Sequence, residues 1–539
     1  MKKSNFLEGA FIATFAIIFT KILGVIYVIP FYNIIGEQGG ALYGYSYTIY
    51  NFFLSISTVG LPLAISKLTS EYNTLDMTSE KVRLYKISRN LILIFSIVSF
   101  LICFIFAKEV AYLIIGNIEN GNSISDVTFT IRMVSFALLV VPLVSIMRGY
   151  LQGHKYIKEP SISQVIEQVV RVIVILLGSY LTLRVFHLSL KTAIGVSVFA
   201  SCLGGLFAYF YLFDIMRRNK SKLIPSNVSE EKVSNKEIIK KVITYSIPFV
   251  IITCANQIYN STDMILLLRI LGRFGYTGSE IETISSVFTT WGVKINSIVI
   301  AISNGLIISL IPHIVSLYVK KEYDNVNTLF NKCLKIVLLV IIPISVFISV
   351  NSYSVWMIFY GENKFGYLII RLNILLTILD SLYLIVNSLL QSLSKYKILF
   401  TTVGLGIMIN LICDIPMMYL FNYLGLHAFY GAIFATFIGL STSLIVAFRY
   451  LKKELNFSYK STIKLIPRSI INIVILVIIN LLVSLILPIR SSSRLMQIVN
   501  VGVLGVVSLV FYIILYRNYL EEILPSKVVR MLKKVKVIK

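Results

Sequence analysis

Two lysines, Lys21 and Lys294, lie inside apolar stretches that are long enough to cross a lipid bilayer. A cation within a membrane-spanning helix costs about 2.5–3.5 kcal/mol on insertion scales, so it is retained where it faces water or a ligand. The compact ammonium group suits a phosphate or a pyrophosphate, which it contacts as a point charge. We therefore predict that both lysines bind the anionic group of a substrate. The alternative is that each side chain snorkels to an interface or pairs with a buried carboxylate.

Glu167 and Arg171 form a second candidate group within another apolar stretch. Their i,i+4 spacing places both side chains on one face of a helix, where they can meet. One interpretation is a neutral ion pair that braces the helix. The other is the wall of a substrate cavity, in which the ion pair opens when an anionic substrate arrives.

Three oxygen-bearing side chains, Asp263, Asn410 and Asp414, form a candidate cation site. Asn410 and Asp414 share a helix face by the same spacing, whereas Asp263 lies in a separate apolar stretch. Carboxylates inside membranes commonly hold ions or relay protons, so we predict that this group binds Na⁺ or carries a proton. The alternative is a hydrogen-bonded or protonated aspartate at a contact between helices, or an aspartate close to an aqueous end of its helix.

The elements that must position these residues are long apolar runs. Hydrophobic residues make up 57% of the 539 residues and charged residues 14%, below the roughly 25% that is usual in soluble proteins. About fourteen stretches are long enough for the hydrocarbon core: Leu7–Ile35, Leu42–Ser66, Ile87–Ala107, Val127–Met147, Ile162–Leu183, Thr192–Met216, Val242–Leu271, Ser285–Tyr318, Cys333–Trp356, Tyr367–Leu390, Leu399–Phe421, Ala428–Tyr450, Ile463–Leu487 and Ile498–Tyr516. The sequence therefore predicts an all-α polytopic membrane protein.

The distribution of charge predicts the topology. The formal net charge is +25, and with the N-terminus inside, most Lys and Arg residues fall on the cytoplasmic side. This asymmetry follows the positive-inside rule and predicts that both termini are cytoplasmic. We attribute the charge to topology rather than to nucleic-acid binding.

Two segments are predicted to contact the membrane surface. Tyr43, Tyr45, Tyr47 and Tyr50 lie near the expected outer end of the second stretch, as in an interfacial aromatic belt. A sugar-stacking surface is the alternative for these rings. Residues 519–539 mix apolar residues with Lys and predict a basic helix on the inner leaflet, with anionic lipids as its partners.

Residues 217–241 are the clearest break in composition and are predicted to be a cytoplasmic linker. The predicted segments are an N-terminal lobe of six helices (1–216), this linker, a C-terminal lobe of six helices (242–452), two further helices (453–518) and a basic tail (519–539). Tyr150–Tyr156, after the fourth stretch, is similar to Leu389–Tyr396, after the tenth. Because an even number of spans separates the two copies, the lobes are predicted to be parallel, pseudo-symmetric repeats. Alternating-access transporters need such paired lobes, whereas a scaffold that only recruits other proteins does not.

Several motifs are absent from the sequence. The five cysteines are dispersed, so we predict neither a disulfide framework nor a cysteine metal site. There is no G-x-x-x-x-G-K-[ST] run for ATP hydrolysis, and no outer loop carries the paired acids or histidines of a membrane-embedded glycan ligase. We therefore expect a transporter rather than an enzyme, with no bound cofactor, driven by Na⁺, protons or the membrane potential.

Four segments carry a family resemblance: Thr20–Tyr32, Gly60–Lys67, Arg148–Gly153 and Ser163–Gln168. With these segments, the sequence resembles the polysaccharide-exporter branch of the multidrug/oligosaccharidyl-lipid/polysaccharide (MOP) superfamily. Within that branch it is similar to the MurJ-type lipid II flippases of Gram-positive bacteria and to the stage V sporulation protein B group. The resemblance implies two six-helix lobes around a cationic cavity, and a groove for a prenyl tail formed by the last two helices. It also implies that Lys21 and Lys294 occupy basic cavity positions, and that Asn410, Asp414 and Asp263 match a sodium site of some members.

The function implied by this resemblance is transport of a lipid-linked sugar. A lipid II-type precursor on undecaprenyl pyrophosphate would move from the inner to the outer leaflet of the bacterial plasma membrane by alternating access. Val28 and Asn33 stand where sporulation-type relatives often carry Arg, so another lipid-linked polysaccharide unit is an alternative substrate. A cation-coupled drug exporter of the same superfamily is a further alternative, although its cavity should be dominated by carboxylates. Cell-wall synthases are the expected protein partners.

Overall fold

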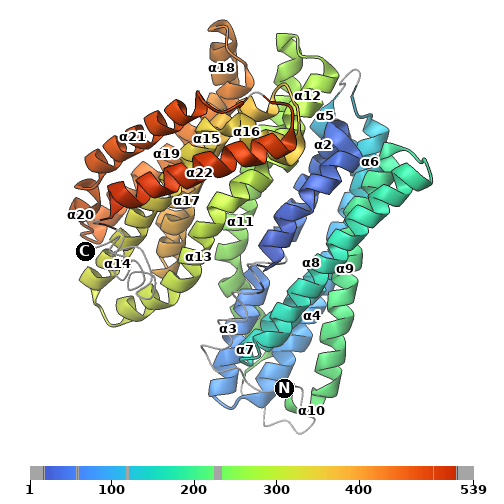
Figure 1. Ribbon diagram of the computed structural model, residues 1–539. Helices are drawn as coiled ribbons and strands as arrows, with labels where there is room; N and C mark the ends of the chain where they lie inside the picture. The colour runs from blue at the N-terminus through green and yellow to red at the C-terminus, as the bar shows by residue number, and fades with distance from the viewer. Residues whose placement is uncertain are drawn as a thin grey trace. The chain divides into compact units, whose positions relative to one another are not determined.

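The computed structural model describes residue 16 and residues 19–55, 58, 60–116, 121–223, 233–489, 491–517 and 519. Within these ranges the chain forms α-helices joined by short 3₁₀ and π-helical segments, and no β-strand is present (Figure 1). The predicted all-α fold is confirmed. Parts of three predicted segments lie outside the described residues. They are residues 7–15, 17 and 18 of the first predicted span, residues 224–232 of the predicted linker and residues 520–539 of the predicted tail.

Among the described residues, 11 helices are long and apolar enough to cross a membrane. They coincide with the third to sixth and the eighth to fourteenth predicted stretches: Thr78–Ile105, Ile124–Gly153, Lys158–Val185, Leu190–Arg218, Gly278–Gly305, Tyr323–Val350, Gly366–Ser392, Tyr396–Tyr423, Phe429–Glu454, Lys460–Ser484 and Arg494–Tyr516. The chain is therefore a multi-pass membrane protein.

The first, second and seventh predicted stretches do not each correspond to one of these 11 helices. The helix Phe19–Ile26 and α2 (Val28–Ser55) meet at a bend of 44° and together meet the same criterion, which gives up to 12 spans in the described part. Within α2, Gly36 has φ 66° and ψ −162°, a conformation that glycine adopts readily, and it lies between the first two predicted stretches. The seventh stretch lies within α11 (Asn235–Leu271), a helix of 37 residues. The total of fourteen spans stays a prediction.

The helices group into two compact units, Met1–Trp291 and Gly292–Lys539. After α2, the first unit contains α3 (Leu61–Thr74), α4 (Thr78–Ile105), α5 (Ala107–Ile115), α6 (Ile124–Ser135), α7 (Ala137–Gly153), α8 (Lys158–Tyr180), η2 (Leu181–Val185), α9 (Leu190–Arg218), α10 (Lys220–Leu223), α11, η3 (Gly272–Phe274), α12 (Gly278–Ser286) and η4 (Val287–Trp291). The second unit contains α13 (Gly292–Val319), α14 (Tyr323–Ile336), η5 (Val337–Ile341), α15 (Ile342–Val350), α16 (Ser352–Tyr360), α17 (Gly366–Ser392), α18 (Tyr396–Tyr423), α19 (Phe429–Glu454), α20 (Lys460–Ile463), α21 (Ile466–Ser484) and α22 (Arg494–Tyr516). The boundary between the units lies beyond the predicted linker, and the division into two six-helix lobes stays a prediction.

Helix α7 organises the core of the first unit by packing against α3, α4 and α9. Val144, Met147 and Tyr150 of α7 form a buried cluster with Ile65 of α3 and Leu212 of α9. Because these side chains recur every three to four residues on α7, one helix face supplies the contacts to several neighbours. This packing fixes α7 beside α8, where the candidate ion pair lies.

The middle of α2 packs closely on the π-helical turn η4. A Cβ atom on Gly40 would lie 2.3 Å from Trp291 Nε1, and one on Gly44 would lie 2.1 Å from Thr289 Oγ1. Thr290 Oγ1 donates a hydrogen bond to the Gly40 carbonyl at 2.9 Å. Glycine is therefore needed for this approach, and π-helical turns of this kind are frequent at functional sites.

The tyrosines of α2 face the interior of the first unit. Tyr43, Tyr45 and Tyr50 are buried, and the Tyr47 hydroxyl forms a hydrogen bond with the Ser201 hydroxyl of α9. The predicted interfacial belt is wrong, because these rings pack between helices instead of facing lipid headgroups. A ring with a polar tip suits both environments, so residue type alone does not distinguish them.

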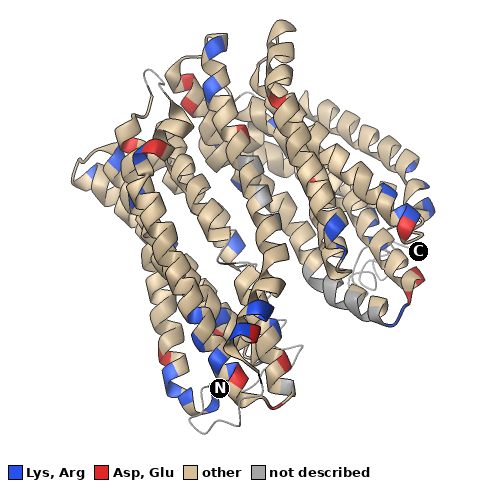
Figure 2. Cartoon of the chain, turned by 180° about the vertical axis from the view of Figure 1, so that it is seen from behind, with Lys and Arg blue, Asp and Glu red and all other residues tan. Residues whose placement is uncertain are grey.

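Helix α17 lies at the centre of the second unit and packs against α13, α15, α16 and α19. Helix α18 packs along α19, and α21 lies beside α22 (Figure 1). Charged side chains are found mainly toward helix ends, as expected for helices that cross hydrocarbon (Figure 2). Candidate site residues such as Glu167 and Asp414 are exceptions, because they lie well inside their helices.

Candidate functional site

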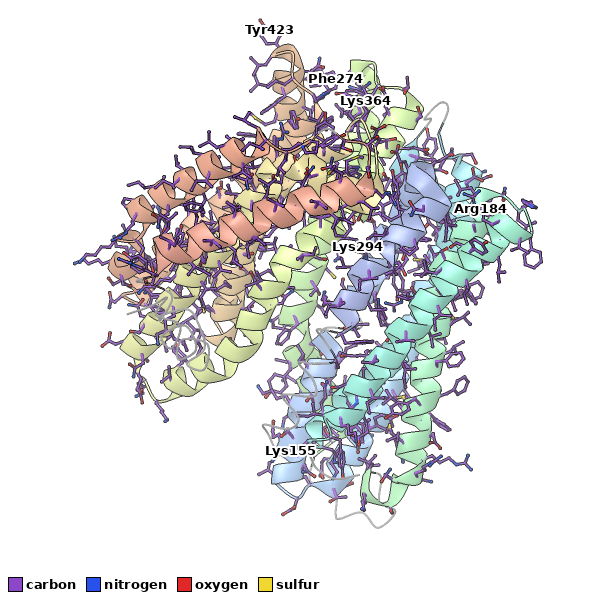
Figure 3. The ribbon with its side chains drawn as sticks, in the orientation of Figure 1. Lys155, Arg184, Phe274, Lys294, Lys364 and Tyr423 are labelled. Atoms are coloured by element: carbon purple, nitrogen blue, oxygen red, sulfur yellow. The ribbon has the colours of Figure 1, made fainter. Side chains whose placement is uncertain are left out.

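The two predicted lysines belong to different compact units. Lys21 is an exposed residue of the helix Phe19–Ile26 in the first unit. Lys294 is half-buried in the first turn of α13 in the second unit (Figure 3), and its carbonyl accepts a hydrogen bond from Ser297 Oγ at 2.7 Å. Their convergence on one cavity stays a prediction.

Glu167 of α8 contacts two arginines. Arg171, one turn further along α8, forms the ion pair that the i,i+4 spacing predicts. Arg148 of α7 contacts the other carboxylate oxygen, with Nη2 at 2.9 Å from Glu167 Oε2, and its Nε donates to Ser163 Oγ at 2.7 Å. The structure therefore adds Arg148 to the predicted pair, and we call Arg148, Glu167 and Arg171 the arginine–glutamate cluster.

The arginine–glutamate cluster carries an excess of positive charge. With two guanidinium groups and one carboxylate ionised, its formal charge is +1. The side chains of Arg148, Glu167 and Arg171 are 14%, 11% and 22% exposed, so water screens them little. Arg171 Nε is buried and has no hydrogen-bond partner among the described residues. A buried cationic group with a spare donor is suited to an anionic oxygen.

The packing of α8 on its neighbours holds this cluster in place. A Cβ atom on Gly204 of α9 would lie 2.6 Å from the Glu167 carbonyl oxygen, so α8 and α9 approach closely beside the cluster. Ser163 Oγ, the acceptor for Arg148, donates to the Pro160 carbonyl at 2.6 Å. The arginine of α7 is thereby tied to the first turns of α8.

The second unit contains the oxygen-rich group predicted from Asn410 and Asp414. Asp414 of α18 is fully buried, and neither of its carboxylate oxygens has a hydrogen-bond partner among the described residues. Asn410, one turn earlier, is also buried, and its Nδ2 donates to Thr436 Oγ1 of α19 at 3.3 Å. The structure thus adds Thr436 to the predicted group.

These donor atoms fit a hard monovalent cation or a proton. A buried carboxylate without partners is costly in apolar surroundings, and a bound cation or protonation removes that cost. Carboxylate, amide and hydroxyl oxygens are ligands of hard cations. No group of three or more His, Cys, Asp or Glu residues that could hold a metal is present among the described residues. Asp263 lies half-buried on α11 in the other compact unit, and its part in the cation site stays a prediction.

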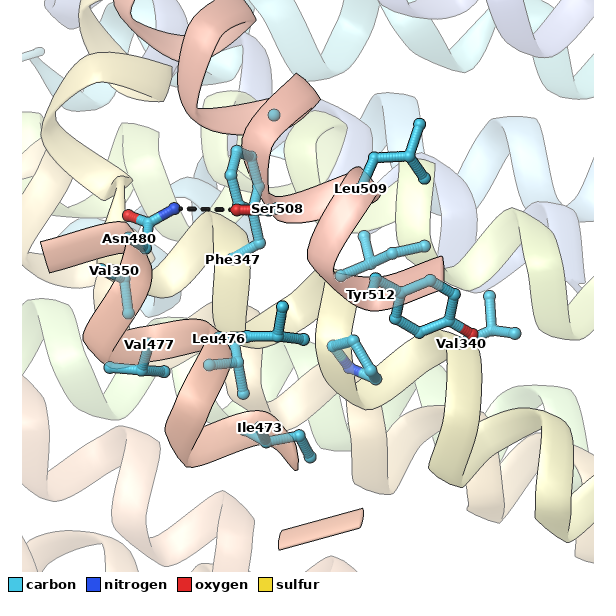
Figure 4. Close-up of a pocket in the computed structure, with 14 residues that line it drawn as sticks. Val340, Phe347, Val350, Ile473, Leu476, Val477, Asn480, Ser508, Leu509 and Tyr512 are labelled. Carbon is cyan, nitrogen blue, oxygen red and sulfur yellow. Dashed lines mark hydrogen bonds between the residues drawn. The ribbon is translucent and has the colours of Figure 1, made fainter. Parts of the chain in front are cut away.

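An apolar groove lies along α21 and α22 and extends to η5 and α15 of the second unit. Its volume is about 400 Å³, and Figure 4 shows its lining residues. The residues that line it are almost all apolar: Val340, Pro343, Ile344, Val346, Phe347, Val350, Ile473, Leu476, Val477, Asn480, Gly505, Ser508, Leu509 and Tyr512. We call this the α21–α22 groove.

Three polar side chains line the α21–α22 groove and form hydrogen bonds within the protein, although the Asn480 Oδ1 atom has no partner among the described residues. Asn480 Nδ2 donates to Ser508 Oγ at 3.1 Å (Figure 4), and the Tyr512 hydroxyl donates to the Leu339 carbonyl at 2.7 Å. The groove therefore presents mainly carbon to an occupant, which suits a hydrocarbon chain.

Arg148 and Thr436 were not predicted from the sequence, and the reason is the same for both. Arg148 and Glu167 face each other across the α7–α8 hairpin, and Asn410 and Thr436 face each other across the α18–α19 hairpin. The i,i+4 rule finds partners only within one helix. In the α7–α8 hairpin, positions 148 and 163 lie equally far from the end of α7 and the start of α8. Pairing positions in this way would have predicted the hydrogen bond that is present between them.

Comparison with known proteins identifies the family of this chain. Residues 6–275 match the family described as polysaccharide biosynthesis protein. The chain is 31% identical over 470 residues to the lipid II flippase MurJ of Bacillus subtilis (strain 168), which covers 86% of this chain and 85% of that protein.

Solved structures share the fold. A lipid II flippase MurJ in an inward closed conformation matches with a TM-score of 0.68 at 16% identity, covering 94% of this chain and 99% of that one. An inward-facing multidrug resistance transporter of the MATE family, in the MOP superfamily, matches with a TM-score of 0.66 at 12% identity, covering 81% and 94%. By the sequence match over most of its length, this chain belongs to the polysaccharide biosynthesis protein family, in the group that includes the flippase MurJ.

Proposed function

We propose that this protein is a flippase that moves an undecaprenyl-pyrophosphate-linked cell-wall precursor, lipid II, from the inner to the outer leaflet by alternating access. The observation that carries the proposal is the 31% identity to a lipid II flippase over 86% of the chain. The substrate has an anionic diphosphate, a polar glycan and a long hydrocarbon tail. The chain offers cationic side chains within its helices and an apolar groove at their periphery, which support binding of the first and the last of these.

Lys21, Lys294 and the arginine–glutamate cluster are the residues that we assign to the diphosphate. Ammonium groups contact phosphate oxygens as point charges, and a guanidinium can bind two of them at once. An arriving diphosphate competes with Glu167 for Arg148 and Arg171, so the ion pairs exchange one anion for another. Neutralising the cationic side chains lowers the cost of enclosing them in a dry cavity, which favours closure of the inner side.

The α21–α22 groove is assigned to the prenyl tail. In the bilayer the tail is already surrounded by hydrocarbon, so this groove holds it through van der Waals packing rather than by removing it from water. A hydrocarbon tail that remains in this groove or in lipid needs no polar path. Only the headgroup then has to pass through the protein.

Asn410, Asp414 and Thr436, with Asp263 as a further candidate, are assigned to a coupling cation. If bound, Na⁺ would supply the charge that Asp414 needs in its buried position, and a proton on the carboxylate would serve the same purpose. The membrane potential is an alternative driving force, because moving one elementary charge through 100 mV corresponds to about 2.3 kcal/mol.

We place the protein in the bacterial plasma membrane with both termini in the cytoplasm, with anionic lipids and cell-wall synthases as partners. The excess of positive charge in the arginine–glutamate cluster favours an anionic substrate over the cationic drugs of a multidrug exporter. A flippase for another lipid-linked polysaccharide unit shares all these features and differs only in its glycan.

Depletion of the protein in its own cells tests the substrate. We expect the lipid-linked precursor of the wall polymer to accumulate on the inner leaflet. Mass spectrometry of the extracted lipids then identifies its glycan. Accumulation of a different undecaprenyl-linked glycan would support the second substrate. No accumulation of any lipid-linked sugar would overturn the proposal.

A further inference from the structure

Glu282 of α12 is a buried carboxylate that the sites described above do not use. It is 3% exposed, and its Oε1 accepts a hydrogen bond from the backbone N–H of Asn122, which lies between α5 and α6. Among the described residues, no Lys, Arg or His forms an ion pair with Glu282. An ionised carboxylate in such a place is costly, because one N–H group replaces only part of the water that the charge loses. Protonation removes this cost.

Glu282 takes part in contacts that join three connections between predicted spans. Asn122 Nδ2 donates a hydrogen bond to the Gln38 carbonyl of α2 at 3.0 Å, so Asn122 bridges α2 and α12. Thr283, the neighbour of Glu282, donates from its Oγ1 to Glu37 Oε2 at 2.5 Å. These groups come from the connections after the first, third and seventh predicted stretches, and the predicted topology places all three on the outer side. We call Gln38, Asn122 and Glu282 the outer bridge.

The outer bridge lies beside the close contact between α2 and η4. Helix α2 packs against α12 and against η4, which follows α12 directly (Figure 1). Trp291 of η4 is 0% exposed, and its ring lies 5.1 Å from the Tyr32 ring and 6.0 Å from the Phe31 ring. Separation of α12 and η4 from α2 would therefore break the outer bridge and expose Trp291 to water.

The groups around Glu282 favour a proton as its neutralising ligand. Asp126 of α6 acts on Glu282 as a like charge, and Tyr45 of α2 is a buried neutral neighbour. Arg269 of the adjacent α11 instead donates to the Leu113 carbonyl at 2.8 Å. The N–H donor at the carboxylate would repel a metal cation, whereas a protonated carboxyl can still accept this hydrogen bond through its carbonyl oxygen.

We propose that Glu282 holds a proton while the outer bridge is formed, and releases it to water on the outer side when α12 separates from α2. The bridged state keeps the carboxyl group away from water, whereas separation hydrates it and allows it to ionise. By linkage, the bound proton stabilises the bridged state, and raising the pH shifts the population toward the separated state. This proton site lies in the first unit, whereas Asp414 lies in the second. Its coupling to transport rests on the proposed function.

The fluorescence of Trp291 in the full-length protein, held in nanodiscs without lipid II, tests this inference. The sequence contains two tryptophans, so Trp356→Phe leaves Trp291 as the only one. We expect its emission to move to longer wavelength as the pH is raised, because water reaches the ring. Glu282→Gln stays neutral and can still accept the Asn122 N–H, so it should abolish this shift. Glu109→Gln, at an exposed acid of α5, should retain it.

A second variant tests the bridge without changing Glu282. Asn122→Ala removes the hydrogen bond to the Gln38 carbonyl and keeps the backbone N–H. Because the bridged state is then less stable, the midpoint of the fluorescence shift should move to lower pH.

The outcomes separate this inference from the proposed function. Absence of the shift in the Trp356→Phe parent, an equal shift in Glu282→Gln, or an unchanged midpoint in Asn122→Ala overturns the inference. A shift produced by Na⁺ at constant pH, and not by pH, overturns the proton as the ligand. A protein that shows the predicted shift and does not move lipid II overturns the proposed function and leaves the proton site standing.

Discussion

The arginine–glutamate cluster gives a quantitative prediction about stability. Glu167→Gln removes the one carboxylate shared by Arg148 and Arg171 and leaves two guanidinium groups facing an amide. At an effective dielectric constant of about 20, the Arg148–Glu167 contact at 2.9 Å corresponds to about 6 kcal/mol of Coulomb energy. Removing one partner of a buried ion pair costs about 3–5 kcal/mol. We therefore expect Glu167→Gln to lower the free energy of unfolding by about 3–5 kcal/mol.

The chain offers a matched control for this substitution. Asp214 and Arg218 form an i,i+4 ion pair at the same 2.9 Å, but these side chains are 49% and 73% exposed. Asp214→Asn should cost only about 0.3–0.5 kcal/mol, because solvent screens the pair. Unfolding in mixed detergent and SDS micelles, followed by circular dichroism, compares the two variants. Equal losses for Glu167→Gln and Asp214→Asn would refute the conclusion that the cluster is buried and mutually dependent.

Three further predictions concern packing, the groove and the cation site. Gly204→Val should lower the free energy of unfolding by about 1–3 kcal/mol in the same assay, because its Cβ would lie 2.6 Å from the Glu167 carbonyl oxygen. Unchanged stability would contradict the close approach of α8 and α9. Gly505→Phe fills the α21–α22 groove and should weaken the binding of a polyprenyl pyrophosphate about tenfold, as measured by calorimetry. Gly502→Phe, with nothing within 4 Å of its Cβ position, should leave the affinity unchanged. Equal affinities of the two variants would exclude the tail from the groove. Asp414→Asn should leave a folded protein whose translocation in vesicles no longer responds to a Na⁺ or pH gradient, and an unchanged response would remove Asp414 from the coupling site.

The sequence predicts the helices well because each long apolar run must satisfy its own backbone hydrogen bonds in the membrane. Eleven of the predicted stretches coincide with spanning helices among the described residues. The contact between Glu167 and Arg171 was also predictable, since both side chains lie on one helix face. These are consequences of local geometry, which the order of residues determines directly.

Contacts between helices were harder to predict from the sequence. Arg148 and Thr436 were missed because their partners lie on neighbouring helices, and no periodicity within one helix reveals them. The tyrosines of α2 were assigned to an interface because a ring with a hydroxyl is equally suited to a packed core. The turn between α16 and α17 depends on Gly361, which has a positive φ, and on hydrogen bonds that the Asn363 side chain accepts from backbone N–H groups. Such features follow from packing, which composition and hydropathy do not encode.

The central claim of the proposed function is that Lys21 and Lys294 bind the diphosphate of a lipid-linked substrate, which the protein moves across the membrane. The most direct measurement is the rate of lipid II translocation by the purified protein in sealed vesicles. We expect Lys21→Ala and Lys294→Ala each to lower this rate about tenfold or more, since hydrogen bonds to charged groups contribute about 1.5–3 kcal/mol. Lys452→Ala, at an exposed lysine on the end of α19, should retain the wild-type rate. Full translocation by both Lys21→Ala and Lys294→Ala would contradict the account.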